Sequence, residues 1–301
     1  MKLEANGIDI EVEDSGGGGP AVLLIMGLGM QLVGWPPDLV QGLVDAGYRV
    51  IRHDNRDVGL SRHFDEFGVP NLLWALAKSR IGIAPKAPYS LEDMARDSLG
   101  VLDALGVREA HVVGASMGGM IAQRVALLGS DRLWSLTSIM STSGAPGLPG
   151  PGADVMRAMF GQPKSAAPEH VFEYSLMLYK LIGSPAFPMT NADLRDRVVE
   201  AARRSFNLGG VPRQMLAIAA DTTRAEALPS IRAPTLVLHG TADVLVPFAC
   251  GEDTARRIPG ARLVPIEGMG HDLPPGAVQR LLPPLIQHLE AHSPAARREA
   301  A

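Results

Sequence analysis

One serine of this chain stands in a setting that turns a hydroxyl group into a nucleophile. Ser116 is the centre of a G-x-S-x-G pattern that runs from Gly114 to Gly118. A short apolar run precedes the pattern and a helical run over 119–128 follows it, and such a strand–turn–helix arrangement lifts a serine hydroxyl clear of a sheet. The glycines leave room for so sharp a turn. We therefore predict that Ser116 is a nucleophile rather than part of an ordinary glycine-serine turn.

A serine hydroxyl is a weak nucleophile near neutral pH, so it needs a neighbouring base. His271 lies in a glycine-rich loop after the predicted strand 261–265, where its ring can reach over the edge of a sheet. His239 falls at the end of another predicted strand, and we expect it to be buried. His288 and His292 lie in a helical stretch near the C-terminus, and we expect them to face solvent. His271 is therefore the predicted base.

The base must in turn be oriented by a carboxylate, which in this arrangement follows the strand that precedes the histidine. Asp243 lies in a glycine turn after the predicted strand 235–239. It would accept a hydrogen bond from the far ring nitrogen of His271 and hold the imidazole in the required tautomer. Asp272 adjoins His271, but its side chain points elsewhere on most backbones. An aspartate in such a loop also commonly forms an Asx turn, so Asp243 has two possible roles.

Acyl transfer also needs hydrogen-bond donors aimed at the oxygen that becomes negative. One predicted donor is the backbone N–H of Met117, directly after the nucleophile. The second is expected in the loop after the predicted strand 21–26, where we choose the backbone N–H of Leu28. Gly27 and Gly29 lack the third glycine of a dinucleotide-binding pattern, so we assign this loop to the same site.

These residues must be held by a sheet whose strands end at one edge. Short runs rich in apolar residues alternate with helical patterns, and the predicted strands cover 8–13, 21–26, 48–52, 110–113, 136–140, 235–239 and 261–265. The clearest helix covers 90–105, where Ser90 and Asp93 match a capping box and Gly106 ends the periodicity. Strands that alternate with helices predict an α/β fold with a doubly wound, mostly parallel sheet.

The alternation breaks over 145–229, which holds helical patterns and no strand-like run. We predict a helical cap there, inserted in a core formed by 1–144 and 230–292, with a disordered tail over 293–301. The cap is rich in methionine and aromatic residues, which suit a pliable apolar pocket. Met177 and Tyr179 are the predicted substrate contacts, although such residues also form a cap's own core. A second irregular segment, 64–89, includes the mostly apolar stretch 72–83, and its role is left open.

Composition excludes several classes of protein. The 28 basic and 32 acidic residues leave a net charge of −4, which gives no footprint for nucleic acid. A single cysteine, Cys250, excludes an intramolecular disulfide and cysteine-rich zinc modules. Neither a metal-binding cluster nor a phosphate-binding loop is present, so we expect no metal and no cofactor. The partner that we expect is a small-molecule ester, and the oligomeric state is left open.

The sequence also predicts where the protein works. No basic start followed by an apolar core of signal-peptide length is present at the N-terminus. Residues 20–37 carry no charge, but several glycines and prolines interrupt them and the continuous apolar run covers only 21–26. A membrane-spanning helix needs about 20 predominantly apolar residues. We therefore expect no membrane span and a cytoplasmic protein.

Several segments together make the chain resemble the α/β-hydrolase fold superfamily. They are M-G-L-G at 26–29 with Trp35, R-H-D-N-R-D-V-G-L-S at 52–61, H-V-V-G-A-S-M-G-G at 111–119, P-T-L-V-L-H-G-T-A-D at 234–243 and G-M-G-H at 268–271. Within the superfamily the chain looks most like aclacinomycin methylesterase-type esterases. The resemblance implies that Asp54 and Arg56 belong to a structural turn after a strand. Many relatives carry His-Gly where this chain has Met26-Gly27.

These observations predict a serine hydrolase that cleaves small to medium, largely neutral and apolar carboxylic esters through an acyl-enzyme intermediate. The serine at 116 argues against the members of the superfamily that use an aspartate nucleophile there, the haloalkane dehalogenases and epoxide hydrolases. One alternative is that the same triad acts on a lactone, a carbon–carbon bond or a peracid. A second is a ligand-binding receptor that retains the triad but turns over slowly. Turnover of a chromogenic ester separates an enzyme from such a receptor.

Overall fold

An eight-stranded sheet in the order β1-β2-β4-β3-β5-β6-β7-β8 forms the centre of the computed structural model, which describes residues 1–72, 85–161, 163–207 and 209–293. The strands are β1 (Lys2–Ala5), β2 (Ile8–Asp14), β3 (Ala21–Ile25), β4 (Arg49–His53), β5 (Ala110–Ala115), β6 (Leu133–Ile139), β7 (Thr235–Gly240) and β8 (Arg262–Ile266). Pairing is antiparallel between β1 and β2 and between β2 and β4, and parallel elsewhere. The predicted mostly parallel α/β sheet is confirmed.

The central strands read as continuous apolar runs because both of their faces are covered. Every residue of β3, β5 and β7 is buried. Each predicted strand has a counterpart in the sheet, whereas β1 was not predicted because its four residues alternate charged and apolar side chains without a longer run. Since β3, β5, β6, β7 and β8 lie side by side and run parallel, the loops that follow them open at the same edge.

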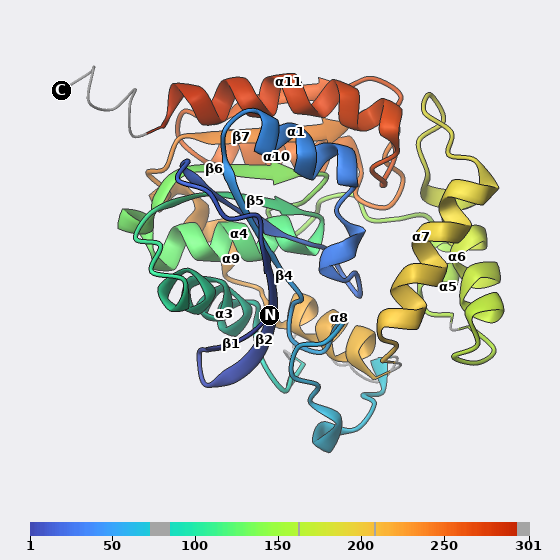
Figure 1. Ribbon diagram of the computed structural model, residues 1–301. Coiled ribbons are helices and arrows are strands. Elements are labelled where there is room, and N and C mark those ends of the chain that lie inside the picture. Colours follow the sequence, from blue (N-terminus) through green and yellow to red (C-terminus); the bar gives the residue numbers. More distant parts are fainter. Residues whose placement is uncertain (73–84, 162, 208, 294–301) are drawn as a thin grey trace.

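Helices cover both faces of the sheet, as Figure 1 shows. On one face α1 (Pro37–Asp45) and α11 (Pro275–Ala291) share an apolar cluster with β3, β5 and β7. On the other face α3 (Leu91–Ala104) and α4 (Met117–Leu128) share a second cluster. α10 (Phe248–Arg257) packs against β7. The short 3-10 helices are η1 (Leu32–Gly34), η2 (Asp65–Phe67), η3 (Ser130–Arg132) and η4 (Leu228–Ser230).

Two local predictions have opposite outcomes. The capping box of α3 is confirmed: Ser90 Oγ accepts from the Asp93 amide at 3.0 Å, and Asp93 Oδ2 accepts from the Ser90 amide at 2.8 Å. The expectation that His288 faces solvent is wrong, because its residue is only 6% exposed. His288 follows Leu281 and Leu285 at helical spacing, so it lies on the stripe of α11 that packs onto the sheet.

The helices between β6 and β7 differ in how they are attached. They are α5 (Ala153–Met159), α6 (Pro168–Ile182), α7 (Asn191–Arg204), α8 (Gly210–Ala220) and α9 (Arg224–Ala227). α6 has no buried residue, whereas α8 buries Arg213, Gln214, Leu216 and Ala217. Figure 1 places α5, α6 and α7 together beside the sheet and α8 below its end. The end of the predicted cap is therefore tied into the core, and the division into core and cap stays a prediction.

Part of the predicted segments lies outside the described residues. These are most of the apolar stretch 72–83 and all but the first residue of the tail 293–301. Within the described ranges, no helix combines the length and the apolar character that crossing a membrane requires.

Candidate active site

Ser116 occupies the sharp turn between β5 and α4. Its backbone has φ 56° and ψ −122°, a conformation that non-glycine residues seldom adopt and that marks a position the surrounding fold over-determines. A Cβ atom on Gly114 would collide with the carbonyl of Gly118, and one on Gly118 would collide with the carbonyl of Ile25. Both glycines of the motif are therefore required by the close approach of backbone segments around the serine.

Ser116, His271 and Asp243 form a continuous hydrogen-bonded chain. His271 Nε2 lies 2.9 Å from Ser116 Oγ, and His271 Nδ1 lies 2.7 Å from Asp243 Oδ2. The three side chains come from the loops after β5, β8 and β7, which the parallel sheet brings to one edge. The structure thus brings together all three residues that the sequence nominated.

Asp243 holds its position through the second carboxylate oxygen. Oδ1 accepts hydrogen bonds from the amides of Leu245 at 2.9 Å and Val246 at 2.8 Å. Asp243 therefore forms the Asx turn and also contacts His271. The Asx turn fixes the orientation of the carboxylate, and with it the position of the oxygen that faces His271. Nε2 of the buried His239 lies 3.6 Å from Oδ2 and 2.8 Å from the carbonyl of Val246. Burial lowers the pKa of His239, so this second imidazole stays neutral beside the carboxylate.

The two predicted oxyanion donors lie on either side of the nucleophile. Met117 is the first residue of α4, whose N-terminus favours a nearby negative charge. Across from it, a Cβ atom on Gly27 would lie 3.0 Å from Ser116 Cβ and 3.2 Å from the Ala115 carbonyl, so only glycine lets this loop come so close. Neither Met117 nor Leu28 donates its amide hydrogen to another described residue. By contrast, the Gly29 amide donates to Gln214 Oε1 at 2.8 Å.

Residues of α7 and α8 hold this loop, which we call the oxyanion loop (residues 27–34). Gln31 Nε2 donates to the carbonyls of Ala201 at 2.7 Å and Ser205 at 2.8 Å. Arg204 Nη1 donates to Gln31 Oε1 at 2.8 Å. Gln214 bridges the loop and the turn after β4, since its Nε2 donates to the Arg56 carbonyl at 2.9 Å. Contacts from α7 and α8 and from Ser205 thus hold the oxyanion loop in place.

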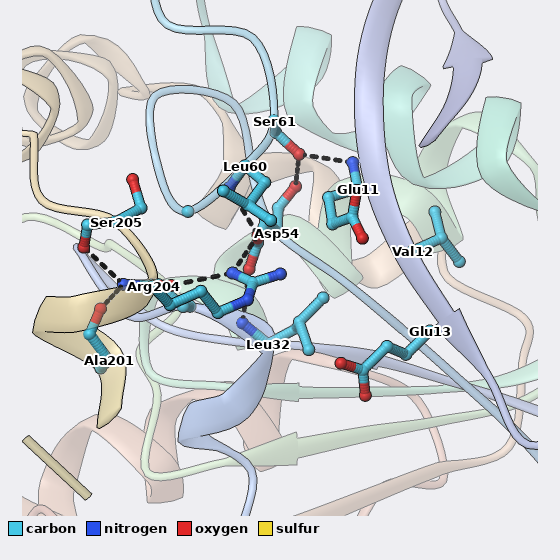
Figure 2. A network of polar contacts seen from close by, with 12 residues as sticks. Glu11, Val12, Glu13, Leu32, Asp54, Leu60, Ser61, Ala201, Arg204 and Ser205 are labelled. Carbon is cyan, nitrogen blue, oxygen red and sulfur yellow. Dashed lines mark hydrogen bonds and ion pairs between the residues drawn. The ribbon is translucent and has the colours of Figure 1, made fainter. Parts of the chain in front are cut away.

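Asp54 belongs to the same network and contacts Arg204, as Figure 2 shows. Its buried carboxylate accepts from the amides of Leu32 at 2.7 Å and Leu60 at 2.9 Å, and it pairs with Arg204 at 2.5 Å. Burial raises the pKa of Asp54, while these three donors oppose the rise. Nearby, the Arg56 guanidinium pairs with Asp97 at 2.7 Å. The expectation that Asp54 and Arg56 serve as scaffolding agrees with these contacts.

The structure also contains a buried ion pair that was not predicted from the sequence. Arg213 on α8 binds both carboxylate oxygens of Asp57, at 2.8 and 2.7 Å, and the Tyr89 hydroxyl donates to the same carboxylate at 2.6 Å. Breaking such a pair leaves one charge buried and uncompensated, which typically costs about 3–5 kcal/mol. Arg213 and Asp57 are separated by 156 residues. No local pattern could have linked them.

The two predicted substrate contacts do not share one surface. Met177 and Tyr179 lie two residues apart on α6, and residues at that spacing face different sides of a helix. The Met177 side chain is 43% exposed. The Tyr179 hydroxyl accepts from the Met189 amide at 3.0 Å, so it is engaged within the protein.

Comparisons with known proteins identify the family of this fold. A family model described as alpha/beta hydrolase fold matches residues 20–275. A rhodomycin D methylesterase of Streptomyces sp. is 31% identical over 94% of this chain and 96% of its own. A 2-hydroxy-6-oxononadienedioate/2-hydroxy-6-oxononatrienedioate hydrolase of Pseudomonas sp. is 27% identical over 89% and 87% of the two chains.

Solved structures show the same fold at lower identity. The enol-lactonase from Burkholderia xenovorans superposes with a TM-score of 0.70 and 23% identity, over 96% of this chain and all of that one. A thermophilic esterase from Thermogutta terrifontis gives a TM-score of 0.70 and 23% identity, over 97% and 99% of the two chains. The resemblance seen in the motifs is confirmed, and the chain belongs to the α/β-hydrolase fold family.

Proposed function

We propose that this protein is a carboxylic ester hydrolase in which Ser116 is the nucleophile, His271 the general base and Asp243 the orienting carboxylate. The observation that carries the proposal is the chain of hydrogen bonds from Ser116 Oγ through both nitrogens of His271 to Asp243 Oδ2, at 2.9 and 2.7 Å. Methylesterase relatives of similar length support ester hydrolysis as the reaction.

The first half of the reaction transfers the acyl group to the enzyme. Ser116 Oγ attacks the ester carbonyl while its proton passes to His271 Nε2. Asp243 accepts from Nδ1–H and stabilises the imidazolium that forms. The carbon–oxygen bond to the alcohol then breaks, and the proton on Nε2 goes to the departing alkoxide. The products of this half are a free alcohol and an acyl ester on Ser116.

The second half repeats the proton transfers with water. His271 Nε2 takes a proton from water, the hydroxide attacks the acyl-Ser116 carbonyl, and the proton returns to Ser116 Oγ as the acid leaves. In both halves the carbonyl oxygen becomes negative. The amides of Met117 and Leu28 are the proposed donors to that oxygen, and removing one such donor typically costs about 100- to 1000-fold in kcat.

The residues above the sheet edge determine substrate specificity, because the triad and the oxyanion donors interact in the same way with most acyl groups. We assign this role to the cap, residues 145–229, with Met177 as the exposed apolar contact. The proposed substrates are small to medium, largely neutral esters, and the relatives named as methylesterases favour esters of small alcohols. Relatives named for carbamate, carbon–carbon and haloperoxidase chemistry keep a lactone, a carbon–carbon bond or a peracid as alternative electrophiles.

A substrate panel with triad variants tests the proposal. Purified wild-type protein is assayed against methyl esters, short- and long-chain chromogenic esters and lactones, with a chelator present throughout. We expect ester turnover that the chelator does not affect and that Ser116→Ala and His271→Ala each abolish. A fluorophosphonate should label Ser116 once in the wild type. Binding of esters without turnover would instead support the receptor alternative, and turnover of lactones alone would move the reaction to that class.

A further inference from the structure

The loop that carries His271 is held from two sides. Its sheet side is β8, an edge strand that leaves most of its residues partly exposed. The other side is the C-terminal end of α6 and the turn after it. We call residues 268–272 the histidine loop and residues 182–186 the α6 terminus.

Three hydrogen bonds join these two segments. The His271 amide donates to the Ile182 carbonyl at 2.7 Å, and the Ala186 amide donates to the Gly268 carbonyl at 3.1 Å. The Gly270 amide donates to Ser184 Oγ at 2.9 Å. A Cβ atom on Gly270 would lie 2.5 Å from the Ile182 carbonyl oxygen, so the backbones are in direct contact. The backbone on both sides of the imidazole is therefore fixed by the α6 terminus.

Asp272 and Ser184 close this contact with their side chains. The hydroxyl of Ser184, a residue only 4% exposed, donates to Asp272 Oδ1 while it accepts from Gly270. The second carboxylate oxygen of Asp272, Oδ2, is buried without a hydrogen-bond partner among the described residues. Burial raises the pKa of Asp272, and the hydrogen bond from Ser184 opposes the rise. Burying a carboxyl group is costly unless it is hydrogen-bonded or paired. The reaction derived above does not use Asp272.

The groups around Asp272 indicate its role. Tyr179 and Ser184 reach it from the cap, His271 is its neighbour in the chain, and Arg197 on α7 donates to the Leu273 carbonyl at 3.3 Å. None of them places Asp272 within the hydrogen-bonded chain of Ser116, His271 and Asp243. Asp272 therefore acts on the backbone of the histidine loop rather than on the imidazole ring.

We propose that Asp272 and Ser184 are positioning residues that fasten the histidine loop to the α6 terminus, so that the placement of the base depends on the helix that carries Met177 and Tyr179. The inference rests on the proposed function, because it assigns a role in placing the proposed base. The inference also predicts that α6 controls the position of His271 relative to any substrate that binds against this helix. A shift of about 1 Å in a reacting group costs roughly a hundredfold in rate.

The test compares Ser184→Ala, Asp272→Asn, Asp272→Ala and the double variant Ser184→Ala/Asp272→Ala. We expect kcat to fall between about tenfold and a hundredfold in Ser184→Ala and Asp272→Ala, with KM within about twofold, because neither side chain touches substrate. Asp272→Asn keeps an acceptor for the serine hydroxyl and should retain most of kcat. The double variant should lose no more than the worse single variant, since both residues serve one contact. The rate of fluorophosphonate labelling at Ser116 should fall in parallel.

A matched control separates positioning from stability. Asp253 on α10 also accepts a hydrogen bond from a buried serine, Ser143, at 2.5 Å, and no described contact joins it to the histidine loop. Asp253→Ala should lower the melting temperature while it leaves kcat unchanged. If Asp272→Ala does not fold, the kcat and KM of Ser184→Ala alone test the inference. Wild-type kcat in Ser184→Ala, or a loss confined to KM, would overturn the inference. A wild type without esterase activity, or an active Ser116→Ala, would overturn the proposed function instead.

Discussion

At the scale of single residues, each oxygen of Asp243 has its own partners. Oδ1 accepts two backbone amides and Oδ2 accepts His271, so the carboxylate is oriented before the imidazole meets it. Sequence order alone could nominate Ser116, His271 and Asp243, because the motif and the strand pattern are local. It presented the Asx turn and the triad as alternatives for Asp243. The structure combines them, since a carboxylate has two oxygens.

Asp243→Asn tests that orientation. The amide keeps the acceptor for Leu245 and Val246, so we expect the melting temperature to change little. It removes the charge that stabilises the imidazolium and favours the wrong tautomer, so we expect kcat to fall by about a thousandfold or more. The measurement is kcat on a chromogenic ester beside thermal unfolding. An Asn variant with kcat within tenfold of wild type would place the orienting carboxylate elsewhere.

At the scale of elements, apolar runs and a capping box predicted the strands and α3, because those features act within a few residues. The bracing of the oxyanion loop could not be predicted. Gln31 meets Ala201 across 170 residues, and Gly29 meets Gln214 across 185. These contacts depend on where α7 and α8 pack, which no residue pattern near position 29 encodes. The predicted second donor, Leu28, directly precedes the residues that these distant contacts hold.

Gln214→Leu tests whether α8 positions the oxyanion loop. Gln214 is fully buried, and leucine of similar size leaves the Gly29 amide and the Arg56 carbonyl without that partner. Each such loss costs about 1–3 kcal/mol. We expect a clearly lower melting temperature together with roughly a tenfold lower kcat. The control is Gln41→Ala, which removes an exposed glutamine that bonds Asp45, and should change neither quantity. A Gln214→Leu variant that melts earlier with unchanged kcat would mean that α8 only stabilises the fold.

At the scale of the whole molecule, the single cysteine excluded an intramolecular disulfide, and an apolar cluster on each face of the sheet forms the core. Composition could not show which polar groups that core would enclose. His53 on β4 and His288 on α11 are both buried, and burial lowers the pKa of each from 6.5 to about 4. The side chains of both enter the core because their positions fall on inward-facing stripes. Their charge state therefore couples folding to pH.

The folded state keeps these imidazoles neutral, whereas the unfolded chain takes up protons once the pH falls below about 6.5. Stability is therefore full above that value and is lost as the pH falls toward about 4. We expect His53→Asn to reduce the loss in the free energy of unfolding between pH 7 and pH 5 by about 2 kcal/mol. His170→Asn, which changes a partly buried histidine of α6, is the control substitution. Urea unfolding at the two pH values measures both. Equal slopes in His53→Asn and wild type would contradict the coupling.

The central claim, that Ser116 carries the acyl group during turnover, is tested most directly by intact-protein and peptide mass spectrometry of enzyme quenched while it hydrolyses a chromogenic acetate ester. The account predicts one acetyl group per chain, located on the peptide that contains Ser116 and absent from Ser116→Ala. It also predicts that the acetyl group disappears once the ester is consumed. Rapid turnover with no acyl group on the protein, or an acyl group on another residue with Ser116 unmodified, would contradict it.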